Sequence, residues 1–173
     1  MEIFKKIVDK SLLKEGMSIP VKEQELFLKC LKVNLGFGET INIKVLLNDV
    51  LYDAELKNQK YDKTVYPDHV PVLQIRYSPK SDLAKELRKN FAASRYYLEL
   101  HKDEGEGKKK ISIPEDRKEY VKLVACDEPK TIEFQCEKIN DVEAQELAEI
   151  MEENVLRDIA DYSGWREPSF LLK

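Results

Sequence analysis

Two alternating segments on either side of Asn48 and Asp49 constrain the fold of this chain more than any other feature. Every odd position from 41 to 47 is Ile, Val or Leu, and the even positions from 52 to 56 are Tyr, Ala and Leu. Alternation of this kind is the period of a half-buried strand. Asn-Asp suits the two central positions of a tight hairpin turn. The sequence therefore predicts a β-hairpin formed by residues 41–47 and 51–57.

Other segments predict short strands and helices on both sides of this hairpin. Residues 18–21, Ser-Ile-Pro-Val, predict the end of a strand that leads into a short helix over 22–31. Residues 72–77 alternate again, with Leu73, Ile75 and Tyr77 on one face. Ser81 is suited to cap a helix that runs to Phe91.

The second half of the chain predicts more strands and then a long helix. We expect strands at 96–100, 111–113, 118–126 and 131–136, and a charged, Gly-containing loop at 101–110. Apolar residues recur at helical spacing from 141 to 162. Strands do not alternate with long helices, so a doubly wound parallel sheet is not expected. The pattern favours a mainly β fold of the α+β class, a mostly antiparallel barrel or pseudobarrel with two short helices and a C-terminal helix.

Charge is divided unevenly along the 173 residues. The whole chain has 29 Lys and Arg against 33 Asp and Glu, and residues 131–173 hold 4 of these bases and 11 of these acids. Subtraction leaves 25 bases and 22 acids in residues 1–130, a net charge of +3 against −7 for the remainder. A mildly basic body with an acidic tail permits nucleic-acid binding without requiring it, since two solvated surfaces of opposite sign explain it equally well.

Several classes of protein are disfavoured by missing motifs. The sequence contains neither a GxxxxGK[ST] nor a GxGxxG motif, and Gly36-Phe37-Gly38 precedes a strand rather than a helix. His69 and His101 lack partners at metal-ligand spacing, and the three cysteines form no CxxC pair. Residues 67–68 and 128–130 resemble a metal-nuclease pattern, but Pro129 occupies a position that strand pairing would need. We identify no catalytic residue, metal ligand or cofactor site.

The sequence also indicates the cellular compartment of the protein. No apolar run is long enough to span a membrane, and residues 1–14 carry charges throughout, unlike a secretory signal. Unpaired thiols are typical of a reducing compartment. We expect an intracellular, cytoplasmic protein.

A polar stretch after the hairpin has side chains suited to DNA. Lysine reaches phosphate or guanine, Asn and Gln bond adenine at two points, and tyrosine bonds phosphate or stacks. A smaller cluster of similar residues precedes the strand at 18–21. An ordinary solvated loop is the simpler explanation on composition alone. The residues are Lys57, Asn58, Gln59, Lys60, Tyr61 and Lys63 in the first cluster and Lys10, Ser11 and Lys14 in the second.

The order of these parts resembles the DNA-binding pseudobarrel called the B-three domain, found in plant transcription factors and in bacterial restriction endonucleases. The likeness is carried by the 18–21 strand and its helix, the 41–57 hairpin, the polar segment 58–63, the 72–77 strand and the 81–91 helix. The bacterial branch is more similar, particularly at 52–56 and 73–77. The resemblance implies a seven-stranded open pseudobarrel over residues 1–138, followed by an acidic helical tail or linker at 139–173.

The resemblance also implies how DNA would be bound. Two loops of that family, an N-arm and a C-arm, grip the major groove, and here they would be residues 10–17 and 57–63. Asn58, Gln59 and Lys60 would be the best candidates for base contacts, with Lys10, Ser11, Lys14, Tyr61 and Lys63 mainly on phosphate and Arg76 in support. The tryptophan-rich C-arm of the plant proteins is absent from this sequence.

The favoured expectation is a sequence-specific reader of double-stranded DNA in a bacterial restriction-modification system, without catalysis of its own. The acidic helix would contact a nuclease or motor partner or a second copy, or would pack on its own barrel. Two alternatives remain open: a metal-dependent nuclease in its own right, and a protein-interaction barrel anchored by Trp165 and Phe170.

Overall fold

The computed structural model describes residues 1–59, 72–101 and 112–163, with side chains in the last stretch as far as Glu153. In chain order its elements are β1 (Glu2–Ile7), α1 (Lys10–Lys14), β2 (Gly16–Ile19), α2 (Val21–Leu31), β3 (Thr40–Leu47), β4 (Val50–Gln59), β5 (Val72–Arg76), α3 (Asp82–Asn90), α4 (Ala92–Leu100), the 3-10 turn η2 (Glu115–Arg117), β6 (Tyr120–Ala125), β7 (Thr131–Glu137) and α5 (Val142–Ser163).

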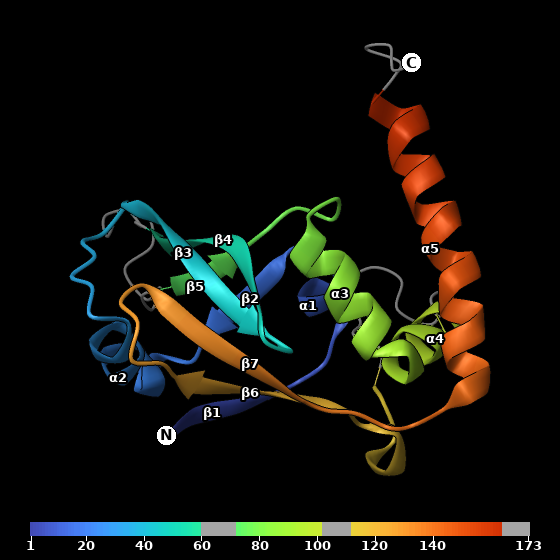
Figure 1. Ribbon diagram of the computed structural model, residues 1–173, viewed down its shortest axis with the longest axis horizontal. Helices are drawn as coiled ribbons and strands as arrows, with labels where there is room; N and C mark the ends of the chain where they lie inside the picture. Colours follow the sequence, from blue (N-terminus) through green and yellow to red (C-terminus); the bar gives the residue numbers. More distant parts are fainter. Residues whose placement is uncertain (60–71, 102–111, 164–173) are drawn as a thin grey trace.

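The described strands form one mixed, seven-stranded sheet in the order β1-β6-β7-β3-β4-β5-β2. The sheet curves into a half-barrel, with α2 at one end and α1, α3 and α4 gathered at the other (Figure 1). The α+β class is confirmed, and most strand pairs are antiparallel, but the sheet is mixed and not antiparallel throughout. β7 pairs in parallel with β3, from Lys44 opposite Thr131 to Leu47 opposite Phe134. This pairing joins segments more than eighty residues apart, and neither strand's alternation specifies its partner's direction.

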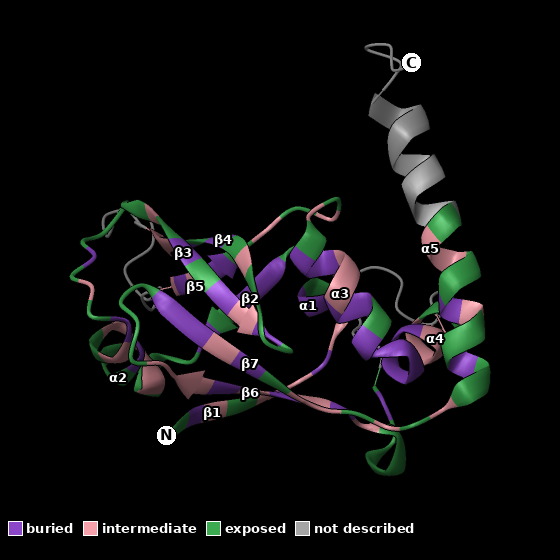
Figure 2. Cartoon of the chain, in the orientation of Figure 1, coloured by how far each residue is buried: buried purple, intermediate pink, exposed green. Residues whose placement is uncertain are grey.

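The central hairpin forms as predicted, from β3 and β4. Asn48 and Asp49 have φ angles of 50° and 66°, and positive φ at both central residues suits the right-handed twist of the flanking strands. Val45 and Leu47 on β3 and Leu56 on β4 are fully buried, so the alternating apolar face forms part of the core (Figure 2).

The predicted strand at 72–77 and the helix after it are also confirmed. β5 buries Leu73 and Ile75, and the Ser81 Oγ accepts a hydrogen bond of 3.1 Å from the Ala84 N–H at the start of α3. That bond satisfies one of the orphan donors of the first turn. Leu83 and Leu87 on α3 are buried against the core.

The strand expected at 96–100 is wrong, because these residues belong to helix α4. Tyr96 lies against Ala92 one turn earlier and against Ala144 and Ala148 of α5, at helical spacing. Leu100, which completed the alternating pattern, is 61% exposed. Three alternating apolar residues were too short a pattern to distinguish a strand from one face of a helix.

The N-terminal region differs from the sequence prediction as well. β1 and α1 were not expected, and more helices than two accompany the sheet. Residues 10–14, expected within a loop-like arm, form α1, which Asp9 caps by accepting a 2.9 Å hydrogen bond from the Leu12 N–H. The strands expected at 118–126 and 131–136 form β6 and β7, whereas Ser112 and Ile113 are not in a strand. Residue 111 and most of the loop expected at 101–110 lie outside the described residues.

The long helix expected at 141–162 is confirmed as α5. Its first half packs on the protein itself, with Ala144 and Ala148 buried against Ala92 of α4. In Figure 2 the buried positions of α5 lie near α4, and exposed ones alternate with them. Within the described residues, no helix combines the length and apolar character needed to cross a bilayer.

Candidate functional site

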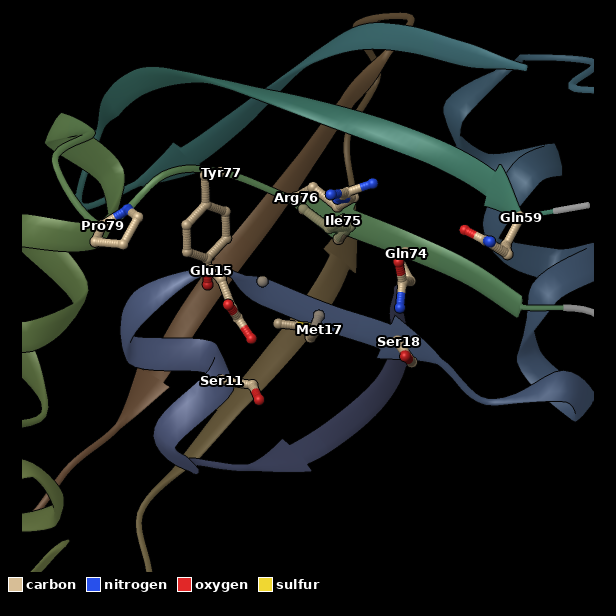
Figure 3. A pocket seen from close by; sticks show the side chains of 11 residues that line it. Ser11, Glu15, Met17, Ser18, Gln59, Gln74, Ile75, Arg76, Tyr77 and Pro79 are labelled. Atoms are coloured by element: carbon tan, nitrogen blue, oxygen red, sulfur yellow. The ribbon is translucent and has the colours of Figure 1, made fainter. Parts of the chain in front are cut away.

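A polar hollow of about 560 Å³ lies where α1 and β2 meet the ends of β4 and β5. Figure 3 shows the side chains that line it, which come from α1 and the turn after it, from β2, β4 and β5, and from the segment that follows β5. The polar members are Ser11 and Glu15 on the α1 side, Ser18 on β2, Gln59 on β4, and Gln74 and Arg76 on β5.

Strand register accounts for this gathering of polar groups. β2 pairs antiparallel with β5 so that Ser18 lies opposite Gln74 and Gly16 lies opposite Arg76. On the other edge of β5, Gln59 lies opposite Val72. Successive side chains of a strand point to opposite faces, so Leu73 and Ile75 enter the core while Gln74 and Arg76 face outward. Ser18 and Gln74 appear close together in Figure 3, and the Gln59 amide is directed toward the hollow.

Close contact between two backbones sets the floor of the hollow at Gly16. Its φ is 139°, and a Cβ built there would lie 2.0 Å from the Ile75 carbonyl oxygen. A side chain at this position would clash with β5 as well as strain the backbone. Glycine is therefore required where β2 meets β5.

Two hydrogen bonds attach α1 and the residue after it, one wall of the hollow, to the residue that follows β5. The Tyr77 hydroxyl donates to the Leu12 carbonyl, and the Tyr77 N–H donates to the Glu15 carbonyl over 3.0 Å. Burial raises the pKa of the Tyr77 phenol well above its ordinary value. The phenol therefore stays protonated and keeps its role as a donor.

Arg88 joins the same wall to the chain beyond β5. Its guanidinium is 2% exposed and donates from Nη1 to the Leu13 carbonyl over 2.9 Å and from Nη2 to the Pro79 carbonyl over 2.8 Å. Its charge is compensated by Glu152 of α5. Three elements distant in sequence thus meet at one side chain and hold the hollow's rim.

Several groups that line the hollow are available to a ligand. In the described part of the chain, no side-chain hydrogen bond or ion pair engages Ser18, Gln59 or Gln74. The same holds there for the Glu15 carboxylate and the Arg76 guanidinium. The hollow therefore presents unused donors and acceptors on both of its sides, which is the chemistry needed to bind a polar surface.

Three of the predicted DNA-binding residues line this hollow: Ser11, Gln59 and Arg76. Lys10 and Lys14 lie on the exposed side of α1, and Lys57 is half-buried near the end of β4. Partial burial, followed by the positive charge of Lys10, lowers the pKa of Lys14. The remaining candidates, Lys60, Tyr61 and Lys63, lie outside the described residues, as do His69, Trp165 and Phe170.

Asn58, a leading candidate for base contact, makes a structural contact within the chain. Its Nδ2 donates to the Leu35 carbonyl over 3.0 Å, and its backbone N–H donates to the Glu39 carbonyl over 3.0 Å. The side chain therefore fixes the loop between α2 and β3 through one of its amide donors.

Sequence reasoning missed Glu15, Ser18 and Gln74. The alternation of residues 72–77 places Gln74 on the same face as Arg76. That shared face was the one signal that could have identified Gln74 as a site residue. Nothing local indicated that β2 pairs with β5, which brings Ser18 beside Gln74.

A second hollow, of about 880 Å³, lies between the β3–β4 turn, α3 and α5. Charges of both signs line it, including Lys85, Lys89 and Lys138 against Glu86 and Glu149. No cluster of three or more His, Cys, Asp or Glu that could hold a metal ion occurs among the residues described.

Comparison of the chain with protein-family models, with curated proteins and with solved structures found no match in any of the three.

Proposed function

We propose that this protein binds double-stranded DNA sequence-specifically, as the recognition module of a bacterial restriction-modification system, and reads bases in the major groove. The observation that carries the proposal is the hollow lined by α1, by the paired strands β2 and β5, and by the end of β4. Side chains capable of bonding base edges line both sides, and the described residues leave them without partners. In the proposed complex the segment from α1 to the start of β2 corresponds to the N-arm, and the end of β4 belongs to the C-arm.

The length of the hollow suits a short recognition site. Gln59, at one end of the hollow, lies opposite Val72 of β5. Glu15, at the other end, is bonded to Tyr77, which follows Val72 by five residues along the chain. At about 3.3 Å per residue these positions are about 17 Å apart. That distance matches about five base pairs at about 3.4 Å each. The polar side chains could therefore contact a run of consecutive base pairs.

Cations beside the hollow supply the contacts to phosphate. Lys10 and Lys14 lie on α1, next to Ser11, and Lys57 precedes Gln59 on β4 by two residues. Phosphate contacts provide affinity and register, whereas base contacts provide specificity. In this proposal Gln59 and Gln74 discriminate between bases, with Arg76 and Ser18 in support.

The acidic helix has a separate role in the proposal. Glu143, Glu146 and Glu149 are exposed on the first half of α5, and phosphates would repel them. This surface therefore faces away from the DNA and would be available to a nuclease or motor subunit or to a second copy of the chain.

Selection from a pool of random duplexes, in the presence of EDTA, tests the proposal. We expect enrichment of a short motif by the wild-type protein. Gln59→Ala and Gln74→Ala should each reduce discrimination against a mismatched site by about 1–3 kcal/mol if their contact is bidentate. Gln135→Ala, at an exposed position of β7 remote in the sheet from β5, is the matched control.

Two results would contradict the proposal. Absence of both motif enrichment and salt-sensitive binding would exclude a DNA reader. Cleavage of the duplex when Mg²⁺ replaces EDTA, abolished by substituting a carboxylate, would support the nuclease alternative instead.

A further inference from the structure

Glu15 is the one carboxylate among the described residues that line the hollow. Its backbone is held on both sides, since its N–H donates to the Ser11 carbonyl over 2.7 Å and its carbonyl accepts from the Tyr77 N–H over 3.0 Å. Its side chain is exposed, and no described cation pairs with it. In Figure 3 the carboxylate extends away from Tyr77, on the same side as Ser11 and Met17.

A carboxylate at this position is unfavourable beside a phosphate backbone but suitable at a base edge. Ionised, it accepts hydrogen bonds and donates none. In the major groove, guanine presents the acceptors N7 and O6, and thymine presents the acceptor O4 and a methyl group. Donors come only from the exocyclic amino groups, N4 of cytosine and N6 of adenine. Glu15 can therefore bond two of the four bases and is repelled by the acceptors of the others.

We propose that Glu15 is a specificity-determining residue that accepts a hydrogen bond from the exocyclic amino group of a cytosine or adenine in the bound site. This inference rests on the proposed DNA-binding function and deepens it. The attachment of α1 to β5 through Tyr77 gives Glu15 a fixed backbone position, which is the condition for selective recognition.

The chemistry of the neighbouring residues makes the inference specific to Glu15. The amides of Gln59 and Gln74 both donate and accept, so they tolerate either kind of base edge. Glu15→Gln converts the acceptor-only group into one of this kind while it preserves size. We therefore expect Glu15→Gln to accept guanine or thymine at one position of the motif that the wild-type protein restricts to cytosine or adenine.

A double-mutant cycle between protein and DNA tests the contact itself. The enriched motif is synthesised with a single amino group deleted, as 2-pyrimidinone in place of cytosine or purine in place of adenine, at each candidate position in turn. Deletion at the position read by Glu15 should weaken wild-type binding about 5- to 150-fold. The same deletion should cost Glu15→Ala almost nothing, because the acceptor has already been removed.

The base type at which the cycle shows coupling identifies the amino group as that of cytosine or of adenine. Glu146→Ala, an exposed glutamate on α5, is the matched control and should keep the full wild-type sensitivity. Circular dichroism and thermal unfolding of each variant establish that the fold is retained.

Failure of the inference is distinguishable from failure of the proposed function. If the wild-type protein enriches a motif but every amino deletion costs Glu15→Ala as much as it costs the wild-type protein, Glu15 does not read bases and the DNA-binding proposal stands. If the wild-type protein binds no duplex, both proposals are overturned together.

Discussion

Arg88 of α3 and Glu152 of α5 form a two-point ion pair, with 2.7 Å between Nε and Oε1 and 3.1 Å between Nη2 and Oε2. The same guanidinium donates to the Leu13 and Pro79 carbonyls at the rim of the polar hollow. Arg95 adds a longer contact of 3.4 Å to Glu152. The acidic helix is thus connected, through one buried side chain, to the proposed DNA-binding surface.

This relationship predicts a large effect on stability. Arg88→Ala should lower the free energy of unfolding by about 3–5 kcal/mol, because it leaves Glu152 with only the longer Arg95 contact and removes the donor to two backbone carbonyls. Chemical denaturation measures the change. Lys44→Ala, which breaks an exposed ion pair with Asp53 on the hairpin, is the control and should cost less than about 1 kcal/mol. Equal losses for the two variants would contradict the importance given to Arg88.

A second effect on stability is expected at Gly16, at the edge of the hollow. Gly16→Ala should destabilise the protein by about 2 kcal/mol or more, since its Cβ meets the Ile75 backbone and the φ of 139° is strained for any side chain. Gly36→Ala is the matched control, because its Cβ meets only the flexible Glu39 side chain, at 3.3 Å. Thermal unfolding compares the two, and a Gly16 variant as stable as the Gly36 variant would contradict the close approach of β2 and β5.

Asn58 should affect stability rather than base discrimination. Asn58→Ala removes the donor to the Leu35 carbonyl, and we expect a loss of about 1 kcal/mol in unfolding free energy. The preference among duplex sequences should be unchanged, unlike that of Gln59→Ala. Loss of discrimination at unaltered stability would instead show that Asn58 reads bases, as the sequence had suggested.

Lys14 should contribute affinity without specificity. Lys14→Ala should weaken binding to all duplexes alike and reduce the slope of log K against log salt by about 1, the effect of one lost phosphate contact. Binding isotherms at several salt concentrations measure this slope. Lys89→Ala on α3 is the comparison and should leave the slope as it is. A change in the enriched motif on Lys14 substitution would place this lysine on a base rather than on phosphate.

We expect the protein to lose stability in alkaline solution because of Cys136. Burial raises the pKa of its thiol from 9.0 to about 11. Above pH 9 the unfolded chain loses this proton while the folded chain retains it, so stability is complete below pH 9 and falls as pH rises through about 11. The slope from one such group is at most about 1.4 kcal/mol per pH unit. Denaturation under reducing conditions should show a shallower decline for Cys136→Ala, and an unchanged decline would refute the assignment.

Local patterns were sufficient for much of the secondary structure. The hairpin was predictable because two residues suited to positive φ separate two alternating runs. The helix at 82–90 was predictable from its Ser81 cap. These signals depend on neighbours within a few residues, so the chain's own periodicity reveals them. The strand predicted at 96–100 was wrong because three alternating apolar residues do not distinguish a strand from a helix: in α4, Tyr96 packs near α5, Leu98 packs on the main core and Leu100 is exposed.

The proposed site required information from across the chain. Gln59 could be selected as a residue type suited to DNA, Ser11 from its cluster with lysines, and Arg76 from the resemblance to the B-three domain. Ser18 and Gln74 became neighbours only because β2 pairs with β5, and Glu15 acquired its position because Tyr77 and Arg88 hold α1 in place.

The sequence by itself determined where most strands and helices lie, which of their faces are apolar, and that the C-terminal segment is an acidic helix. Only the tertiary structure decided that β3 and β7 run in parallel, that β2 lies at the far edge beside β5, and that Glu152 neutralises Arg88. The physical reason is range: periodicity and capping act within a few residues, whereas register and buried ion pairs depend on segments tens of residues apart.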